Sequence, residues 1–256
     1  MPPKTLSILT RFARYCGTVA FFAALISAHA QKVPPGFTYA ISDKPDSYGL
    51  YSVTIRNVSR LDITAIHAFS TCGEGEQSDS VGSDSLLQFL FLRSKSIALN
   101  GPALIAPGRA QQMDMPSSGK RCRQAVSVLF SDGHGEGDDD PTYGWHQMIS
   151  ERYSSYAELQ RTRSMVEGMS DSEANFSEVL LETLDARRMA LNDRSLRDVP
   201  KSEVMSRSYV LDVLLVNMRD PHHMTDDLKS RESSLKLLDS WMTQLREHGY
   251  DKKPAS

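Results

Sequence analysis

The sequence has few of the residues and motifs that are typical of metal binding or nucleophilic catalysis. Its 256 residues include three cysteines and two tryptophans. It contains no C-x-x-C pair, no H-E-x-x-H, no G-x-S-x-G, and no glycine-rich loop placed to hold a phosphate between a strand and a helix. These absences argue against a structural zinc site, a zinc protease, an α/β-hydrolase and a nucleotide-binding enzyme. We therefore expect no cofactor.

An excess of basic charge is also missing. Lys and Arg number 29 against 32 Asp and Glu, for a formal net charge of −3 at pH 7, and neither half of the chain is basic. Nucleic-acid-binding proteins and proteins that bind anionic membrane surfaces carry a basic face. Neither nucleic acid nor an anionic membrane is an expected partner.

One apolar run stands out, and it lies at the start. Lys4, Arg11 and Arg14 precede an uncharged run of about 13 residues, which is short of the roughly 20 needed to cross a bilayer. The pattern Ala28-His29-Ala30 follows it. A basic start, a short apolar run and A-x-A predict a secretory signal peptide over residues 1–30, cleaved near Ala30. We expect a secreted or periplasmic protein; retention of this segment as an anchor is the alternative.

Cleavage would remove Cys16 and leave Cys72 and Cys122 in a compartment that permits disulfides. We predict that these two cysteines are paired. Two buried thiols are the alternative. The pairing implies that the strand ending at Thr71 and the strand beginning near Gln124 are antiparallel neighbours.

The region of residues 31–140 reads as short strands. Tyr51, Val53 and Ile55 alternate with polar residues, the period of a half-buried strand. Further strands are expected at 37–41, 63–71, 86–92, 103–105, 111–115 and 125–130, with an exposed loop over 73–85. Six or seven strands without an intervening helical period predict an antiparallel β-sandwich.

Three segments of this region resemble bacterial immunoglobulin-like or fibronectin-III-like domains of exported proteins. They are VTIRNVS at 53–59, PGR at 107–109 and AVSVLFSDG at 125–133. The resemblance covers about 100 residues and implies a fold and a compartment, with no activity attached. Such domains often carry a strand tryptophan, but Trp145 and Trp241 both lie in the second half.

Residues 141–250 read as helices. Apolar residues recur every three or four positions from Trp145 to Met169, from Phe176 to Leu191, and from Leu228 to Leu245. The run 209–218 is apolar almost all round, which predicts the most buried helix. A capping box at Ser170 and Glu173 and a start near Thr225 are the expected N-terminal signals. The fold class is therefore α+β: a β-sandwich, then a helical bundle, then a disordered tail over 251–256.

The seam between the two halves, residues 124–145, ends in a glycine-rich acidic stretch. Its carboxylates suggest calcium, with Asp132, Glu136, Asp138 and Asp140 as candidate ligands beside Asp139. Aligned to a calcium loop, the third position is His134 and the twelfth is Tyr143, where a bidentate Glu belongs. A solvated hinge loop is the favoured interpretation, and no metal site is predicted. The adjacent pair His222-His223 is a poor metal site because neighbouring side chains diverge.

Two function classes remain open. The first is an exported, non-enzymatic interaction protein whose partner is a protein or a cell-envelope component. The second is a hydrolase whose site is assembled near the β/α junction around His134, Glu136 and His146. A deep pocket lined by histidine and acids would favour the hydrolase, and a shallow groove or flat patch the interaction protein. Oligomeric state and ligand identity are left open by the sequence.

Overall fold

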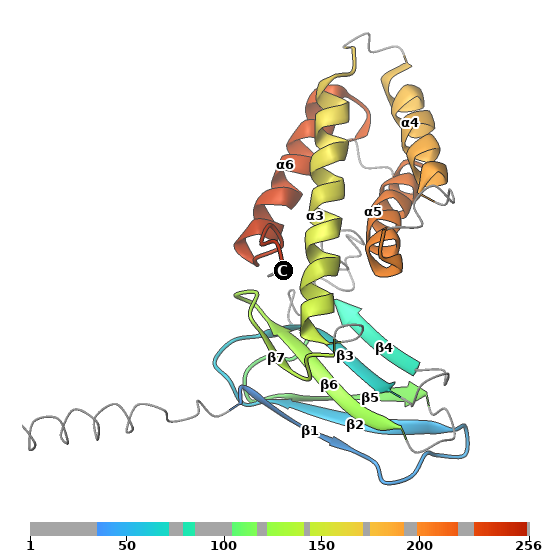
Figure 1. Cartoon of the computed structure of the whole chain (residues 1–256). Coiled ribbons are helices and arrows are strands. Elements are labelled where there is room, and N and C mark those ends of the chain that lie inside the picture. Colours follow the sequence, from blue (N-terminus) through green and yellow to red (C-terminus); the bar gives the residue numbers. More distant parts are fainter. Residues whose placement is uncertain are drawn as a thin grey trace, which may run out of the picture. The chain divides into compact units, whose positions relative to one another are not determined.

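The computed structural model describes residues 35–71, 79–84, 104–116, 122–140, 144–170, 175–191, 199–219 and 228–254. The described residues form seven strands followed by four helices, so the α+β class is confirmed (Figure 1). The predicted signal peptide, Cys72, the expected strand at 86–92 and His222-His223 lie outside the described residues. These four predictions stay as predictions.

The first sheet is antiparallel, in the order β1 (Phe37–Ile41), β2 (Leu50–Asn57), β5 (Ala110–Pro116). In β2 the expected alternation is present, because Val53 and Ile55 are buried while Thr54 and Arg56 are exposed. Val53 lies opposite Met113 of β5, and Tyr51 lies opposite Met115. This sheet therefore has one face toward a core and one toward solvent.

The second sheet is antiparallel, in the order β4 (Asp79–Asp84), β3 (Ile63–Thr71), β6 (Arg123–Phe130), β7 (Gly135–Gly137). The central strands β3 and β6 are buried over most of their length because both of their faces are covered. One face meets the first sheet in a shared hydrophobic cluster that includes Val53, Ile55, Ile66, Val126 and Val128. On the other face, Ala65 and Leu129 contact Met148 of the first described helix.

Two strands occur where the sequence predicted loops. β4 lies inside the expected exposed loop 73–85, and β7 lies inside the acidic seam. Both pair by main-chain hydrogen bonds with a buried neighbour, β3 and β6 respectively, so neither needs an apolar pattern of its own. At Gly135 a Cβ would lie 2.6 Å from the Trp145 ring, which explains why a glycine lies in β7. Of the expected strand at 103–105, residues 104 and 105 are described, and Ile105 forms an isolated bridge with Ile63.

The helices are α3 (Trp145–Glu167), α4 (Phe176–Ala190), α5 (Lys201–Arg219) and α6 (Arg231–Glu247). All four contribute to one hydrophobic cluster. The helix α4 begins at Phe176 with Asn175 as its N-cap, and Glu173 of the expected capping box lies outside the described residues. The helix α6 begins at Arg231 with a capping box made by Ser230 and Ser233, and the start predicted near Thr225 also lies outside the described residues.

The helix α3 lies at the centre of the four (Figure 1). It packs against α5 and α6, while α4 packs against α5. The helix α5 is not buried all round, as the apolar run 209–218 led us to expect, since Val216 is 62% exposed and Tyr209 37%. Leu211, Leu214 and Leu215 are buried as predicted.

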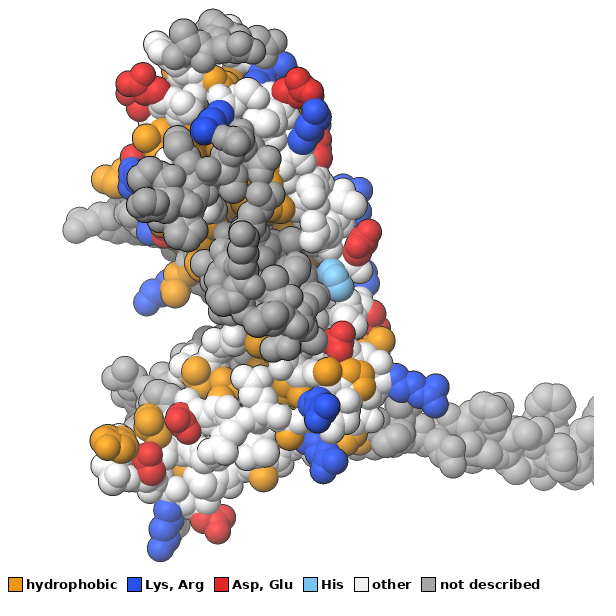
Figure 2. Space-filling model, turned by 180° about the vertical axis from the view of Figure 1, so that it is seen from behind, with side chains coloured by type: hydrophobic (Ala, Val, Ile, Leu, Met, Phe, Trp, Pro, Cys, Tyr) orange, Lys and Arg blue, Asp and Glu red, His pale blue; other side chains and the backbone are white. Residues whose placement is uncertain are grey.

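The N-terminal half of α3 also contacts β3, β6 and β7. Residues 36–256 form one compact unit, and the expected domain boundary at 140 stays a prediction. Within the described ranges, no helix combines the length and apolarity needed to span a membrane. On the face seen in Figure 2, acidic and basic side chains of the described residues are interspersed.

The register of β3 and β6 supports the predicted disulfide. Thr71 lies directly opposite Arg123, which confirms that the two strands are antiparallel neighbours. Cys72 follows Thr71 and Cys122 precedes Arg123 in the sequence. A continued ladder would place the two cysteines opposite each other.

We predict that reduction lowers the free energy of unfolding by about 4 kcal/mol, because the disulfide closes a loop of about 50 residues in the unfolded chain. Urea unfolding with and without a reductant measures this, together with thiol counting in the unfolded protein. A Cys122→Ser variant is the control and should be indifferent to the reductant. Two reactive thiols in the oxidised, exported protein would contradict the pairing.

We also predict that Leu211→Ala and Leu215→Ala each lower the free energy of unfolding by about 2–5 kcal/mol, because they leave cavities in the helical cluster. Val216→Ala, one residue along the same helix but exposed, should change it by less than about 0.5 kcal/mol. Equal denaturation midpoints for the three variants would show that α5 does not anchor the helices.

Candidate functional site

A pocket of about 890 Å³ lies between the sheet and the helices. Strands β3 and β4 form one wall, and the first turns of α3 and of α5 form the others. The lining residues relevant to its chemistry are His67 and Asp84 from the strands, Gln147, Met148, Glu151, Arg152 and Ser155 from α3, and Lys201, Met205 and Tyr209 from α5. The wall is therefore mixed, with apolar side chains, hydroxyls and a few charges.

Arg152 lies at the base of this pocket and joins its walls. Its side chain is 3% exposed, and its Nε lies 2.7 Å from Asp84 Oδ2 at the end of β4. Its Nη2 donates to Thr64 Oγ1 of β3 at 2.9 Å. The guanidinium also lies 4.5 Å from the centre of the Tyr250 ring, a cation–π distance. One side chain of α3 thus contacts two strands and the C-terminal segment.

Tyr250 completes the cluster from the other end of the chain. It is fully buried, and its hydroxyl donates to Asp84 Oδ1 at 2.6 Å. Burial raises the pKa of the Tyr250 phenol well above its usual range, although the Arg152 charge opposes this effect. Both oxygens of Asp84 are therefore engaged, one by a cation and one by a neutral donor.

Glu151, the neighbour of Arg152, has a different environment. It accepts a hydrogen bond from Gln147 Nε2 at 3.1 Å, and within the described residues no cation lies within ion-pair distance of it. Burial raises the pKa of the Glu151 carboxyl, the Gln147 bond opposes this, and the Asp84 charge adds to it. Burial and the Asp84 charge also raise the pKa of Tyr209 across the pocket.

Two buried polar atoms near the base of the pocket lower the stability of the fold. Arg152 Nη1 and Ser155 Oγ are buried and have no hydrogen-bond partner in the described part of the chain. A buried donor without a partner costs about 1–3 kcal/mol. Such costs concentrate where a protein keeps polar groups for a reason other than stability.

A second buried ion cluster lies farther along α3. Glu158 is fully buried and accepts hydrogen bonds from Arg161, from Arg187 of α4 and from Arg207 of α5. The one carboxylate therefore ties three helices together. The described lining of the pocket does not include these residues, so this cluster is an element of the helical packing.

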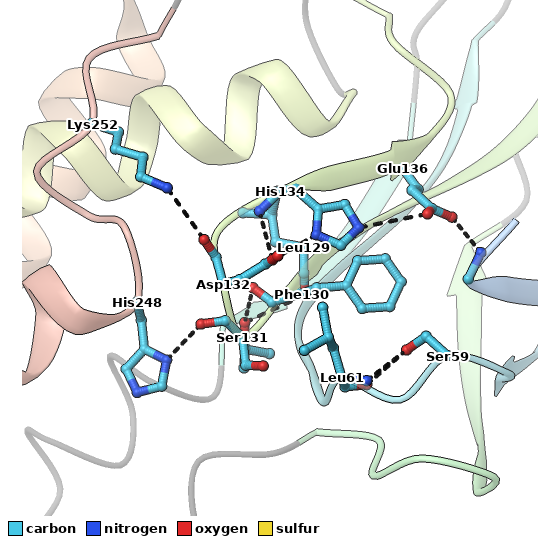
Figure 3. A network of polar contacts seen from close by, with 12 residues as sticks. Ser59, Leu61, Leu129, Phe130, Ser131, Asp132, His134, Glu136, His248 and Lys252 are labelled. Carbon is cyan, nitrogen blue, oxygen red and sulfur yellow. Dashed lines mark hydrogen bonds and ion pairs between the residues drawn. The ribbon is translucent and has the colours of Figure 1, made fainter. Parts of the chain in front are cut away.

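The acidic seam forms a polar network around the β6–β7 hairpin (Figure 3). His134 stacks on Phe130, with 4.4 Å between ring centres, and its Nδ1 lies 2.5 Å from Asp132 Oδ1. Burial alone would raise the pKa of Asp132, but hydrogen bonds from the backbone and ring of His134 outweigh it and lower that pKa. His248 Nδ1 lies 2.8 Å from Ser131 O.

The four calcium candidates contact neighbouring donors and do not converge on one point. Asp132 contacts His134, Glu136 accepts from Gly36 N at 2.6 Å, and Asp138 pairs with Arg123. The Asp140 backbone donates to Asp138 Oδ1 at 3.1 Å. Among the described residues, no three His, Cys, Asp or Glu side chains are grouped to hold a metal ion.

The proposed hydrolase residues are only partly brought together. His134 Nε2 lies 3.5 Å from Glu136 Oε1, but His146 Nδ1 lies 3.7 Å from Asp139 and its ring stacks on Trp145. Sequence reasoning missed the pocket residues Glu151 and Arg152, and it missed Tyr250, which contacts Arg152 and Asp84. One signal was available for Arg152, because it continues the helical spacing of Met148 and Tyr156 in a stripe that is otherwise apolar.

The chain matches no protein-family model and no curated protein sequence. The geometry and chemistry of the pocket therefore carry the functional assignment.

We predict that Arg152→Met lowers the free energy of unfolding by about 3 kcal/mol, because Asp84 then lacks its buried counter-ion. Arg163→Met is the matched control. Arg163 pairs with Asp239 and Glu167 at the surface, where ion pairs contribute little. Chemical denaturation measures both variants. Adding Asp84→Asn to Arg152→Met should recover part of the loss, and strictly additive effects of the two substitutions would contradict the coupling.

Proposed function

We propose that this protein is an exported, non-enzymatic binding protein that holds a small organic ligand in the pocket between β3–β4 and α3–α5. The pocket volume carries the proposal, since about 890 Å³ falls within the range of small-molecule sites. Its wall joins apolar side chains such as Met148 and Met205 to a few polar groups, the usual make-up of such sites. The ligand is a small molecule, either unattached or as the end group of a cell-envelope component.

We further propose that the β region is an immunoglobulin-like sandwich and that the helices form a bundle. The shared hydrophobic cluster of the two sheets supports the first, and the single cluster of the four helices supports the second. Export is supported by the signal-type N-terminus and by the register of Thr71 and Arg123 beside the two cysteines.

Binding is preferred to hydrolysis because of how the acids of the pocket are used. The pocket has a histidine and two acids on its wall, the composition that would suit a hydrolase. However, Arg152 and Tyr250 engage Asp84, and Gln147 holds Glu151. Within the described residues, the hydrogen bond of Glu151 is to an amide and not to a serine or a histidine, as that of a general base or an orienting acid would be.

We predict that filling the pocket abolishes ligand binding. Met205→Trp places an indole at the pocket wall, whereas Met189→Trp places one at a similarly exposed methionine of α4 outside the lining. A fragment library screened by ligand-observed NMR should give hits on the wild type that Met189→Trp retains and Met205→Trp loses. Hits that bind both variants equally, or a screen without hits on the folded wild type, would overturn the proposed function.

A further inference from the structure

The charges that face the pocket do not balance locally. Asp84 and Arg152 form an ion pair and neutralise each other. Glu151 is held by the neutral amide of Gln147. The other cation on the wall, Lys201, is exposed at the start of α5 and lies beyond ion-pair distance of Glu151. The remaining titratable group of the strands is His67, which contributes no negative charge. Within the described wall, one carboxylate is thus left with no paired cation.

The surroundings of Glu151 suit an organic cation better than a metal ion. Ligation of a metal would need several oxygen or nitrogen donors around one point, and the described residues contain no such group. Instead, Met148 and Met205 present polarisable apolar surface, and Tyr209 adds an aromatic ring on the opposite wall. Carboxylate, aromatic ring and apolar surface together are the recognition elements for an ammonium group on an apolar body.

We propose that the pocket takes a small ligand with a protonated amine, which pairs with Glu151 while its apolar part lies against Met148, Met205 and Tyr209. This inference rests on the proposed function and names the ligand class of the same site. Gln147 is a positioning residue, because its amide fixes the carboxylate that would receive the amine.

The ionised Glu151 also acts on the stability of the ligand-free protein. Burial raises the pKa of this carboxyl above the 4.5 of an ordinary glutamic acid. The contribution of such a group to stability is fully present below its unfolded pKa and is lost as the pH rises through its folded pKa. At neutral pH Glu151 therefore lowers stability until a cation pairs with it, which a purely structural carboxylate would not do.

Three probes of similar shape and different charge test the ligand class: phenethylamine, 2-phenylethanol and 3-phenylpropanoate. On the wild-type protein at pH 7.5 we expect phenethylamine to bind at least about tenfold more tightly than the alcohol, and the carboxylate more weakly than either. Glu151→Gln should reduce the preference for the amine over the alcohol to about onefold. Glu178→Gln, which removes the same charge from an exposed position of α4, should keep the preference.

Two further readouts separate a ligand-binding role of Glu151 from a structural one. Glu151→Gln should raise the melting temperature of the ligand-free protein at pH 7.5, and the difference should shrink as the pH approaches 4.5. As the pH is lowered, the affinity for phenethylamine should begin to fall at a pH above that at which an ordinary glutamic acid is protonated. The affinity for the alcohol should stay constant over the same pH range.

The outcomes distinguish the two proposals. Equal binding of the amine and the alcohol, with both lost in Met205→Trp, would overturn the cationic ligand class and leave the binding pocket standing. The cationic ligand class is likewise contradicted if Glu151→Gln lowers the melting temperature and keeps the preference for the amine. If no probe binds and Met205→Trp changes nothing in the fragment screen, the proposed function itself fails.

Discussion

The pairing of Arg152 with Asp84 is the interaction on which the junction of strands and helices depends. A guanidinium at 3% exposure would be very costly alone, so its place on α3 requires Asp84 from β4 and the ring of Tyr250. Those two partners are 166 positions apart in the sequence. Once they are in place, the first turns of α3 are fixed against the sheet, and Met148, Glu151 and Ser155 of the same helix line the pocket.

Several polar groups of the pocket lower the stability of the fold. Within the described residues, a carboxylate without a paired cation, an arginine nitrogen without a partner and a buried serine hydroxyl lie within two turns of α3. The same helix uses its next buried carboxylate differently, since Glu158 receives three arginines. On this one helix, the carboxylate of Glu158 is paired with arginines and the carboxylate of Glu151 has no paired cation. This difference suggests that Glu158 serves packing and Glu151 serves binding.

The sequence predicted the strands and helices whose own apolar residues are buried in a core. The alternation in β2, the apolar run of β6 and the stripe of α3 all appear as expected, because their residues pack against the cores directly. It did not predict β4 and β7, whose Ser, Gly and Glu residues pair with an already buried strand through the main chain. It missed the pocket because Asp84, Glu151 and Tyr209 are far apart in sequence, and nothing local distinguishes them from surface residues. Arg152 alone, inside an apolar stripe, carried a local signal.

Residues 248–252 join the C-terminal end of α6 to the strands and to α3. Tyr250 contacts Asp84 and Arg152, His248 contacts Ser131, and Lys252 Nζ donates to Asp132 O at 3.3 Å. Most of these contacts join positions more than a hundred residues apart, so they are the slowest to form and require the complete chain. Arg152 therefore has an incomplete set of partners until Tyr250 has packed against it. Residues 248–252 thus act as a latch, because the junction of strands and helices is complete only when this segment has docked.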